Sequence, residues 1–140
     1  MSRSVHTLSI VSSTRYLEDV RRFVEHHAHE AGFSERAVSE LKIAVDEACA
    51  NVIKHAYKGS KSGTIDVDVV ISPDRFTVRI RDEGVSFDER AYQEPDIFEF
   101  ARQKKTGGFG VQIMKRLMDR VEYRTRGNSN ECCLIKYRGQ

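Results

Sequence analysis

The chain has 140 residues, of which 39% are hydrophobic and 31% charged, and this size and composition predict one folded domain spanning 1–140. The formal net charge is +2, with basic and acidic residues interspersed, which argues against direct nucleic-acid binding. No segment reaches the roughly 20 apolar residues that cross a bilayer, and Met1 to His6 lack the apolar core of a signal peptide. We therefore expect a cytoplasmic protein without membrane contact.

The cysteines and histidines do not form a recognisable metal or disulfide pattern. Three cysteines occur, at positions 49, 132 and 133, and neither their odd number nor their spacing suits a disulfide framework or a C-x-x-C metal site. We expect them to be small buried residues. His26, His27 and His29 are expected to be exposed on a helix, and no zinc site is predicted.

The amino-terminal part predicts a strand followed by a helix. Residues 6–11 alternate weakly between apolar and polar, which favours a strand. Ser12 or Ser13 then caps a helix that ends at Gly32. The apolar residues of this helix recur at helical spacing: Leu17, Val20, Phe23 and Val24.

A second helix is predicted from Ser34, its amino-terminal cap, to about Tyr57. Glu35 in the first turn suits the helix dipole. An apolar stripe runs along one side of this helix: Val38, Leu41, Val45, Ala48, Val52 and Ala56.

The rest of the chain predicts four strands and a third helix. The strands are 65–69 and 76–80, joined by a tight turn at 72–75, and 121–125 and 132–137, joined by a turn at 127–130. The third helix opens at the glycine-rich segment 106–110. This order predicts an α+β fold, a two-layer sandwich with helices on one face of a mixed, mainly antiparallel sheet.

The second helix carries polar residues opposite its apolar stripe. Glu47 and Asn51 are four residues apart and so share one side, and Lys54 falls close to that line. A solvated face explains this pattern, and periodicity alone favours that explanation. Because Ile43, Ala44 and Ala50 lie on the same side, a partly covered site that binds a metal ion is the alternative.

An aspartate continues an inward-facing strand pattern. Asp82 follows Phe76, Val78 and Ile80 at alternate positions, so its carboxylate is predicted to face the core, where it needs a hydrogen-bond donor. Gly84 would allow the backbone or a ligand to come close. A cap on the following turn and a functional carboxylate both remain open for Asp82.

The glycine cluster precedes the third predicted helix. Gly107, Gly108 and Gly110 would expose backbone N–H groups to an anion at the helix amino terminus, and Lys104 and Lys105 add positive charge. A plain loop is the commoner explanation of such a cluster. The sequence contains no P-loop and no dinucleotide-binding glycine motif.

These segments together resemble the histidine-kinase-like (GHKL) ATPase superfamily, and most closely its branch of anti-sigma factor serine/threonine-protein kinases. The resemblance rests on three boxes in a fixed order along nearly the whole chain. The boxes are Glu47-Ala-Cys-Ala-Asn51-Val-Ile-Lys54-His55-Ala-Tyr, then Asp82-Glu-Gly84-Val-Ser-Phe87-Asp88, then Gly107-Gly108-Phe109-Gly110. It implies a Bergerat-type ATP-binding fold that binds ATP and Mg²⁺.

The resemblance also implies roles for individual residues. Glu47 would be the catalytic base, and Asn51 would be the Mg²⁺ ligand. Asp82 would accept a hydrogen bond from the adenine amino group. Residues 88–106 would form a mobile ATP lid. The other residues implied to contact the nucleotide are Lys54, Gly84, Phe87, Lys105, Thr106, Gly107, Gly108, Phe109 and Gly110.

One departure from the resembled pattern concerns the last strand. The family usually carries a Thr or Ser there that supports the adenine, whereas the matching stretch here is Glu131-Cys132-Cys133-Leu134. Cysteine is a weak hydrogen-bonding group, so nucleotide affinity is expected to differ.

The implied function is transfer of phosphate from ATP to a serine of an anti-sigma factor antagonist, by a homodimeric kinase that also sequesters a sigma factor. One alternative is a non-catalytic, ATP-gated binding regulator of the same fold. Another is the catalytic half of a histidine kinase, which would need a dimerising helical hairpin that this chain does not have room for. The base and the metal ligand do not separate a kinase from a plain ATPase.

Overall fold

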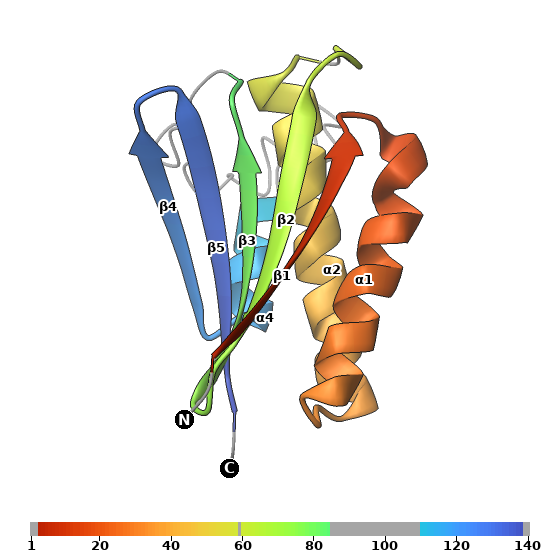
Figure 1. The fold of residues 1–140 in the computed structure, drawn as a ribbon, viewed down its shortest axis with the longest axis vertical. Coiled ribbons are helices and arrows are strands. Elements are labelled where there is room, and N and C mark those ends of the chain that lie inside the picture. The colour runs from red at the N-terminus through yellow and green to blue at the C-terminus, as the bar shows by residue number, and fades with distance from the viewer. Residues whose placement is uncertain (1–2, 59, 85–109, 139–140) are drawn as a thin grey trace, which may run out of the picture.

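The structure is a computed structural model that describes residues 3–58, 60–84 and 110–138 (Figure 1). Its amino-terminal elements are β1 (Ser4–Val11), the 3-10 helix η1 (Thr14–Tyr16), α1 (Leu17–Glu30), α2 (Glu35–Asn51) and the π-helical turn η2 (Val52–Ala56). The later elements are β2 (Thr64–Ile71), β3 (Arg75–Asp82), α4 (Gly110–Leu117), β4 (Arg120–Arg126) and β5 (Ser129–Tyr137).

The strands form one sheet in the order β1-β2-β3-β5-β4, and α1, α2 and α4 cover one of its faces (Figure 1). All four strand pairings among the described residues are antiparallel. The predicted two-layer α+β architecture is therefore confirmed. The described sheet is entirely antiparallel, whereas a mixed, mainly antiparallel sheet was predicted. None of the helices in this part of the chain combines the length and apolarity that crossing a membrane requires.

The predicted start of the second helix is confirmed, whereas α1 begins at Leu17 without a side-chain cap. The Ser34 hydroxyl accepts a hydrogen bond from the Ala37 N–H at 3.2 Å, which satisfies one of the free donors at the start of α2. Ser13 caps the short helix η1, which leads into α1. After α1, Gly32 has a φ of +90°, a conformation that side chains other than glycine rarely adopt.

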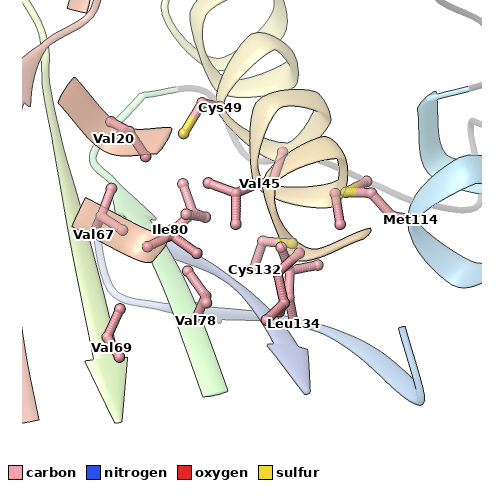
Figure 2. Packing of buried hydrophobic residues seen from close by; sticks show 14 of the residues in the cluster. Val20, Val45, Cys49, Val67, Val69, Val78, Ile80, Met114, Cys132 and Leu134 are labelled. Atoms are coloured by element: carbon pink, nitrogen blue, oxygen red, sulfur yellow. The ribbon is translucent and has the colours of Figure 1, made fainter. Parts of the chain in front are cut away.

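The core lies between the sheet and the helices (Figure 2). Alternate residues of the central strands, among them Val67, Val78 and Ile80, point toward the helices and are fully buried. The helices contribute Val20, Val45 and Met114, which are also fully buried. Burying each such side chain stabilises the fold by about 1.5–3 kcal/mol relative to leaving it exposed.

The cysteine prediction is confirmed, whereas one histidine differs from expectation. Cys49, Cys132 and Cys133 form no disulfide, and all three are buried. His27 is half-buried rather than exposed, because its ring stacks on His6 of β1 with 4.1 Å between ring centroids. Burial lowers the pKa of His27, and neighbouring histidines lower it further.

The sheet face away from the helices holds a buried ion pair. Asp68 alternates with the inward-facing residues of β2, yet its side chain is only 3% exposed, because arginines of β3 lie over it. Arg81 binds it with two hydrogen bonds, Nε to Oδ2 at 2.7 Å and Nη2 to Oδ1 at 3.0 Å, and Thr7 donates to Oδ1 at 2.7 Å. Burial raises the pKa of Asp68, but the hydrogen bonds from Arg81 and Thr7 outweigh it, so the pKa is lowered.

We predict that Asp68→Asn destabilises the protein by about 2 kcal/mol at neutral pH, because it removes the closest anion of the half-buried Arg81. A carboxyl with a lowered folded pKa stabilises the fold above its unfolded pKa, and this contribution is lost as pH falls through the folded value. The difference from wild type should therefore shrink below about pH 4. Urea unfolding measured across pH tests this.

The matched control is Asp66→Asn on the same strand face. The Asp66 side chain is 35% exposed and lies 3.8 Å from Arg81, so a change below about 1 kcal/mol is expected. Equal losses in the two variants would contradict the importance assigned to Asp68.

Candidate nucleotide site

The second helix ends in a widened turn beside the site. Asn51 is the last residue of α2, and Glu47 lies one turn earlier; both are half-buried. The helix then continues to Ala56 as the π-helical turn η2, so the predicted end near Tyr57 is confirmed while the hydrogen-bonding pattern is different. Such turns occur frequently at functional sites.

Gly84 packs directly against η2. A Cβ atom added to Gly84 would lie 2.3 Å from the Ala56 carbonyl oxygen, which is closer than any side chain allows. Only glycine therefore fits where the segment after β3 passes the helix end. This contact fixes the end of β3 relative to α2.

Asp82 lies at the end of β3 and faces the helices, as predicted, with an exposed fraction of 6%. The Gly84 N–H and the Asn130 Nδ2 both donate to its Oδ1 at 2.9 Å. The hydrogen bond from the Gly84 N–H makes Asp82 a cap on the following turn. Because Asp82 also lines a cavity, a capping role and a functional role are compatible. Burial raises the pKa of Asp82, and the two hydrogen bonds oppose that effect.

Asn130 is the site residue that sequence reasoning missed. It was placed in the turn before the last strand, but β5 begins at Ser129, and Asn130 pairs with Asp82 across β3 and β5. Its side chain is buried and also donates to the Gly84 carbonyl at 3.0 Å. Alternation back from the inward-facing Leu134 and Cys132 would have placed it on the same face.

Tyr57 is a second residue without a sequence prediction. Its hydroxyl donates to the Thr64 carbonyl at 2.7 Å and accepts from the Glu83 N–H at 2.9 Å. It therefore ties the start of β2 to the segment between Asp82 and Gly84. A side chain of this kind gives no local pattern in the sequence, because its partners are set by the fold.

The amino terminus of α4 meets α2 at Glu47 and Asn51. A Cβ added to Gly110 would lie 2.6 Å from Glu47 Oε2 and 3.8 Å from Asn51 Oδ1. The structure thus brings together three residues that the resemblance placed at the phosphates. The start of a helix presents free N–H groups and a partial positive charge, which favour an anion.

The chemistry of Glu47 and Asn51 suits a base and a ligand for Mg·ATP. Burial raises the pKa of Glu47, and the nearby charge of Asp46 raises it further. The Asn51 Nδ2 is buried without a hydrogen-bond partner in the described residues, so a phosphate oxygen would satisfy it. Its carbonyl oxygen is the kind of ligand that a hard cation accepts.

A cavity connects these elements. Its walls come from α2, η2, the end of β3, α4, β4 and β5, and include Asn51, Asp82, Asn130 and Cys132. Its volume of about 30 Å³ holds about two waters. Cys133 lies on the opposite face of the sheet from Cys132. It pairs with Arg79 of β3, on the face away from the helices.

The remaining predicted residues have different positions. Lys54 is exposed on η2 and is not among the described residues that line the cavity. The predicted lid, 88–106, lies outside the described residues. So do six predicted nucleotide contacts: Phe87, Lys105, Thr106, Gly107, Gly108 and Phe109. Among the described residues, no group of three or more His, Cys, Asp or Glu side chains is arranged to hold a metal ion.

Comparisons with solved structures support this fold. The RsbU and RsbW domains of Rv1364c from Mycobacterium tuberculosis align over 97% of this chain and 33% of that longer chain, with a TM-score of 0.68 and 14% identity. A chain of the SiaB-SiaC complex from Pseudomonas aeruginosa aligns over 94% of this chain and 89% of its own, with a TM-score of 0.55 and 11% identity. At these identities the likeness concerns the fold alone.

Comparisons of sequence are more specific. The chain is 40% identical over 120 residues to a protein named serine-protein kinase RsbW from Listeria monocytogenes, covering 83% of this chain and 76% of that protein. It is 33% identical over 119 residues to the Bacillus subtilis protein of the same name, covering 81% and 74%. The family described as "Histidine kinase-like ATPase domain" matches residues 10–136. The chain therefore belongs to the histidine kinase-like ATPase domain family.

Proposed function

We propose that this protein is an ATP-dependent serine-protein kinase of a partner-switching system. Its substrate would be a serine of an anti-sigma factor antagonist, and it would also sequester a sigma factor. Support comes from relatives at 33–40% identity that carry the name serine-protein kinase. The match covers more than four fifths of this chain, and the family model matches residues 10–136, which include the segments that build the site.

The position of Glu47 is the observation that carries the proposal. Its carboxylate lies beside the first residue of α4, where an anion is favoured, and one helical turn from Asn51. Its raised pKa makes it a stronger proton acceptor than an ordinary glutamate. A base at the mouth of a phosphate site is what transfer to a hydroxyl requires.

The proposed step needs little covalent chemistry from the protein. Glu47 takes the proton of the substrate serine hydroxyl, whose oxygen forms a bond to the terminal phosphorus of ATP as the bond to ADP breaks. Bound Mg²⁺ would neutralise the phosphate charge, and the Asn51 carbonyl oxygen would hold it. Asp82, which lines the cavity, would accept a hydrogen bond from the adenine amino group.

The partners belong to the same proposal. The antagonist, the sigma factor, homodimerisation and a cytoplasmic location follow from the branch of the family that the sequence resembles. The mixed charge of the chain suits protein partners more than nucleic acid. Sedimentation of the purified protein, alone and with an antagonist, measures the dimer and the complex directly.

We predict that calorimetry detects Mg²⁺-dependent ATP binding in the wild type, and that Asn51→Ala and Asp82→Asn weaken it at least about tenfold, because each loses a polar contact worth over about 1.4 kcal/mol. Glu47→Gln should bind ATP nearly normally, since it keeps the shape of the side chain. It should transfer phosphate to the antagonist at least about a hundredfold more slowly.

Each result has a distinct meaning. A folded wild type that binds no ATP would contradict the proposal. Good ATP binding without any phosphate transfer would instead support the non-catalytic, ATP-gated regulator. Hydrolysis without transfer to protein would identify a plain ATPase.

A second prediction concerns Gly110→Ala. The new Cβ would lie 2.6 Å from Glu47 Oε2, and the carboxylate, at the end of a flexible side chain, moves away at little cost to the fold. Alanine also favours a helix over glycine by up to about 1 kcal/mol. We therefore expect unchanged or higher thermal stability together with at least about tenfold slower phosphate transfer, since a displaced base catalyses poorly.

The matched control is Arg116→Ala, an exposed position on the same helix. It should leave both the melting temperature and the transfer rate close to wild type. Normal transfer in Gly110→Ala would show that the position of Glu47 does not limit the reaction.

A further inference from the structure

The buried carboxylate of Asp82 is held through one of its two oxygens. In the described part of the chain, both hydrogen bonds to this carboxylate go to Oδ1, one from the Gly84 N–H and one from Asn130 Nδ2, each at 2.9 Å. Oδ2 is therefore left to accept a further donor. Because Asp82 lines the cavity, that donor can come from a bound molecule.

The orientation of the Asn130 amide is fixed by its surroundings. Its two N–H bonds point to the Asp82 carboxylate and to the Gly84 carbonyl, which are both acceptors. A flipped amide would set its own oxygen against those two oxygens, so only one orientation is favourable. The amide oxygen of Asn130 accepts a longer hydrogen bond from the Thr125 hydroxyl, at 3.4 Å.

Asn130 is not needed to hold the two strands together. β3 and β5 are paired by their backbones from Arg75–Tyr137 to Asp82–Asn130, and the Asn130 side chain is an addition at the end of this ladder. It is buried, and its amide connects Asp82 to the backbone of Gly84. The side chain therefore acts on the orientation of the carboxylate.

We infer that Asn130 is a positioning residue that sets purine selectivity, by holding Asp82 so that Oδ2 accepts the 6-amino group of adenine and repels the 6-oxo group of other purines. This rests on the proposed function, since it concerns how the same site chooses ATP. An ionised carboxylate only accepts hydrogen bonds, so a carbonyl oxygen facing it has no partner. A site that recognises one polar group strongly rejects a ligand lacking it.

The Asn130 donor also keeps the carboxylate in its accepting form. Burial raises the pKa of Asp82, and the hydrogen bonds from Asn130 and Gly84 counter this. Without the Asn130 donor, the carboxylate is freer to rotate and easier to protonate. A protonated Asp82 would donate to a 6-oxo group, so selectivity would fall from both causes.

The test measures the dissociation constants of Mg·ATP and Mg·ITP by calorimetry, because these nucleotides differ at the 6-position. We expect the wild type to prefer ATP by at least about fiftyfold, the effect of one charged hydrogen bond and one repulsion. Asn130→Leu, which keeps the size but lacks the amide, should reduce this ratio at least about tenfold. Asn130→Thr, which restores a donor, should recover part of it.

The ratio separates positioning from general damage. Cys132→Ala truncates the cavity wall on the same strand and should weaken ATP and ITP by the same factor. If Asn130→Leu does not fold, Asn130→Val takes its place, because valine suits a strand and differs from threonine only in lacking the hydroxyl. Comparing Val with Thr then isolates the donor.

The outcomes distinguish this inference from the proposed function. A wild type that binds neither nucleotide would overturn both. Binding with strong preference for ATP that Asp82→Asn abolishes, but that the Asn130 variants leave unchanged, would overturn the role of Asn130 alone. A fall in the ratio in the apolar variants, with partial recovery in Asn130→Thr, would support it.

Discussion

The site depends on the close contact between the end of β3 and the end of the second helix. Gly84 lies against the Ala56 carbonyl with no room for a side chain, and this fixes Asp82 beside the cavity that Asn51 also lines. Ala56 belongs to the same buried core as the valine, leucine and isoleucine side chains of the sheet and helices, part of which Figure 2 shows. A carboxylate in such a place is stable only with donors, which Gly84 and Asn130 supply.

Much of the fold could be predicted because its determinants are local. The alternation of Phe76, Val78 and Ile80 predicts both a strand and the inward direction of Asp82, and Ser34 predicts the start of α2. The sheet order is not local. It depends on which strands pair. In the described sheet β5 pairs with β3 and β4 lies at the edge, so the last two strands stand in the reverse of their chain order.

Part of the site's geometry could be predicted where it depends on local spacing. Glu47 and Asn51 both lie near Gly110, because residues four apart share a helix side. Their roles toward a nucleotide stay predictions. Asn130 was missed because its role comes from register: it lies opposite Asp82 only once β3 and β5 are paired. Cys132, two residues further along the same strand, lines the cavity as well.

The residues proposed to contact the phosphates and the adenine lie near the two ends of the segment formed by the last turns of α2 and by η2. Glu47 and Asn51 lie on the last turns of α2, and Asp82 is held against η2, the continuation of the same helix. A π-helical turn advances less along the axis per residue than an α-helical one, so it changes the separation between these groups without changing the sequence length. In the proposed function a bound nucleotide contacts Asn51 and Asp82 at once, so the π-helical turn contributes to the distance that the nucleotide has to span.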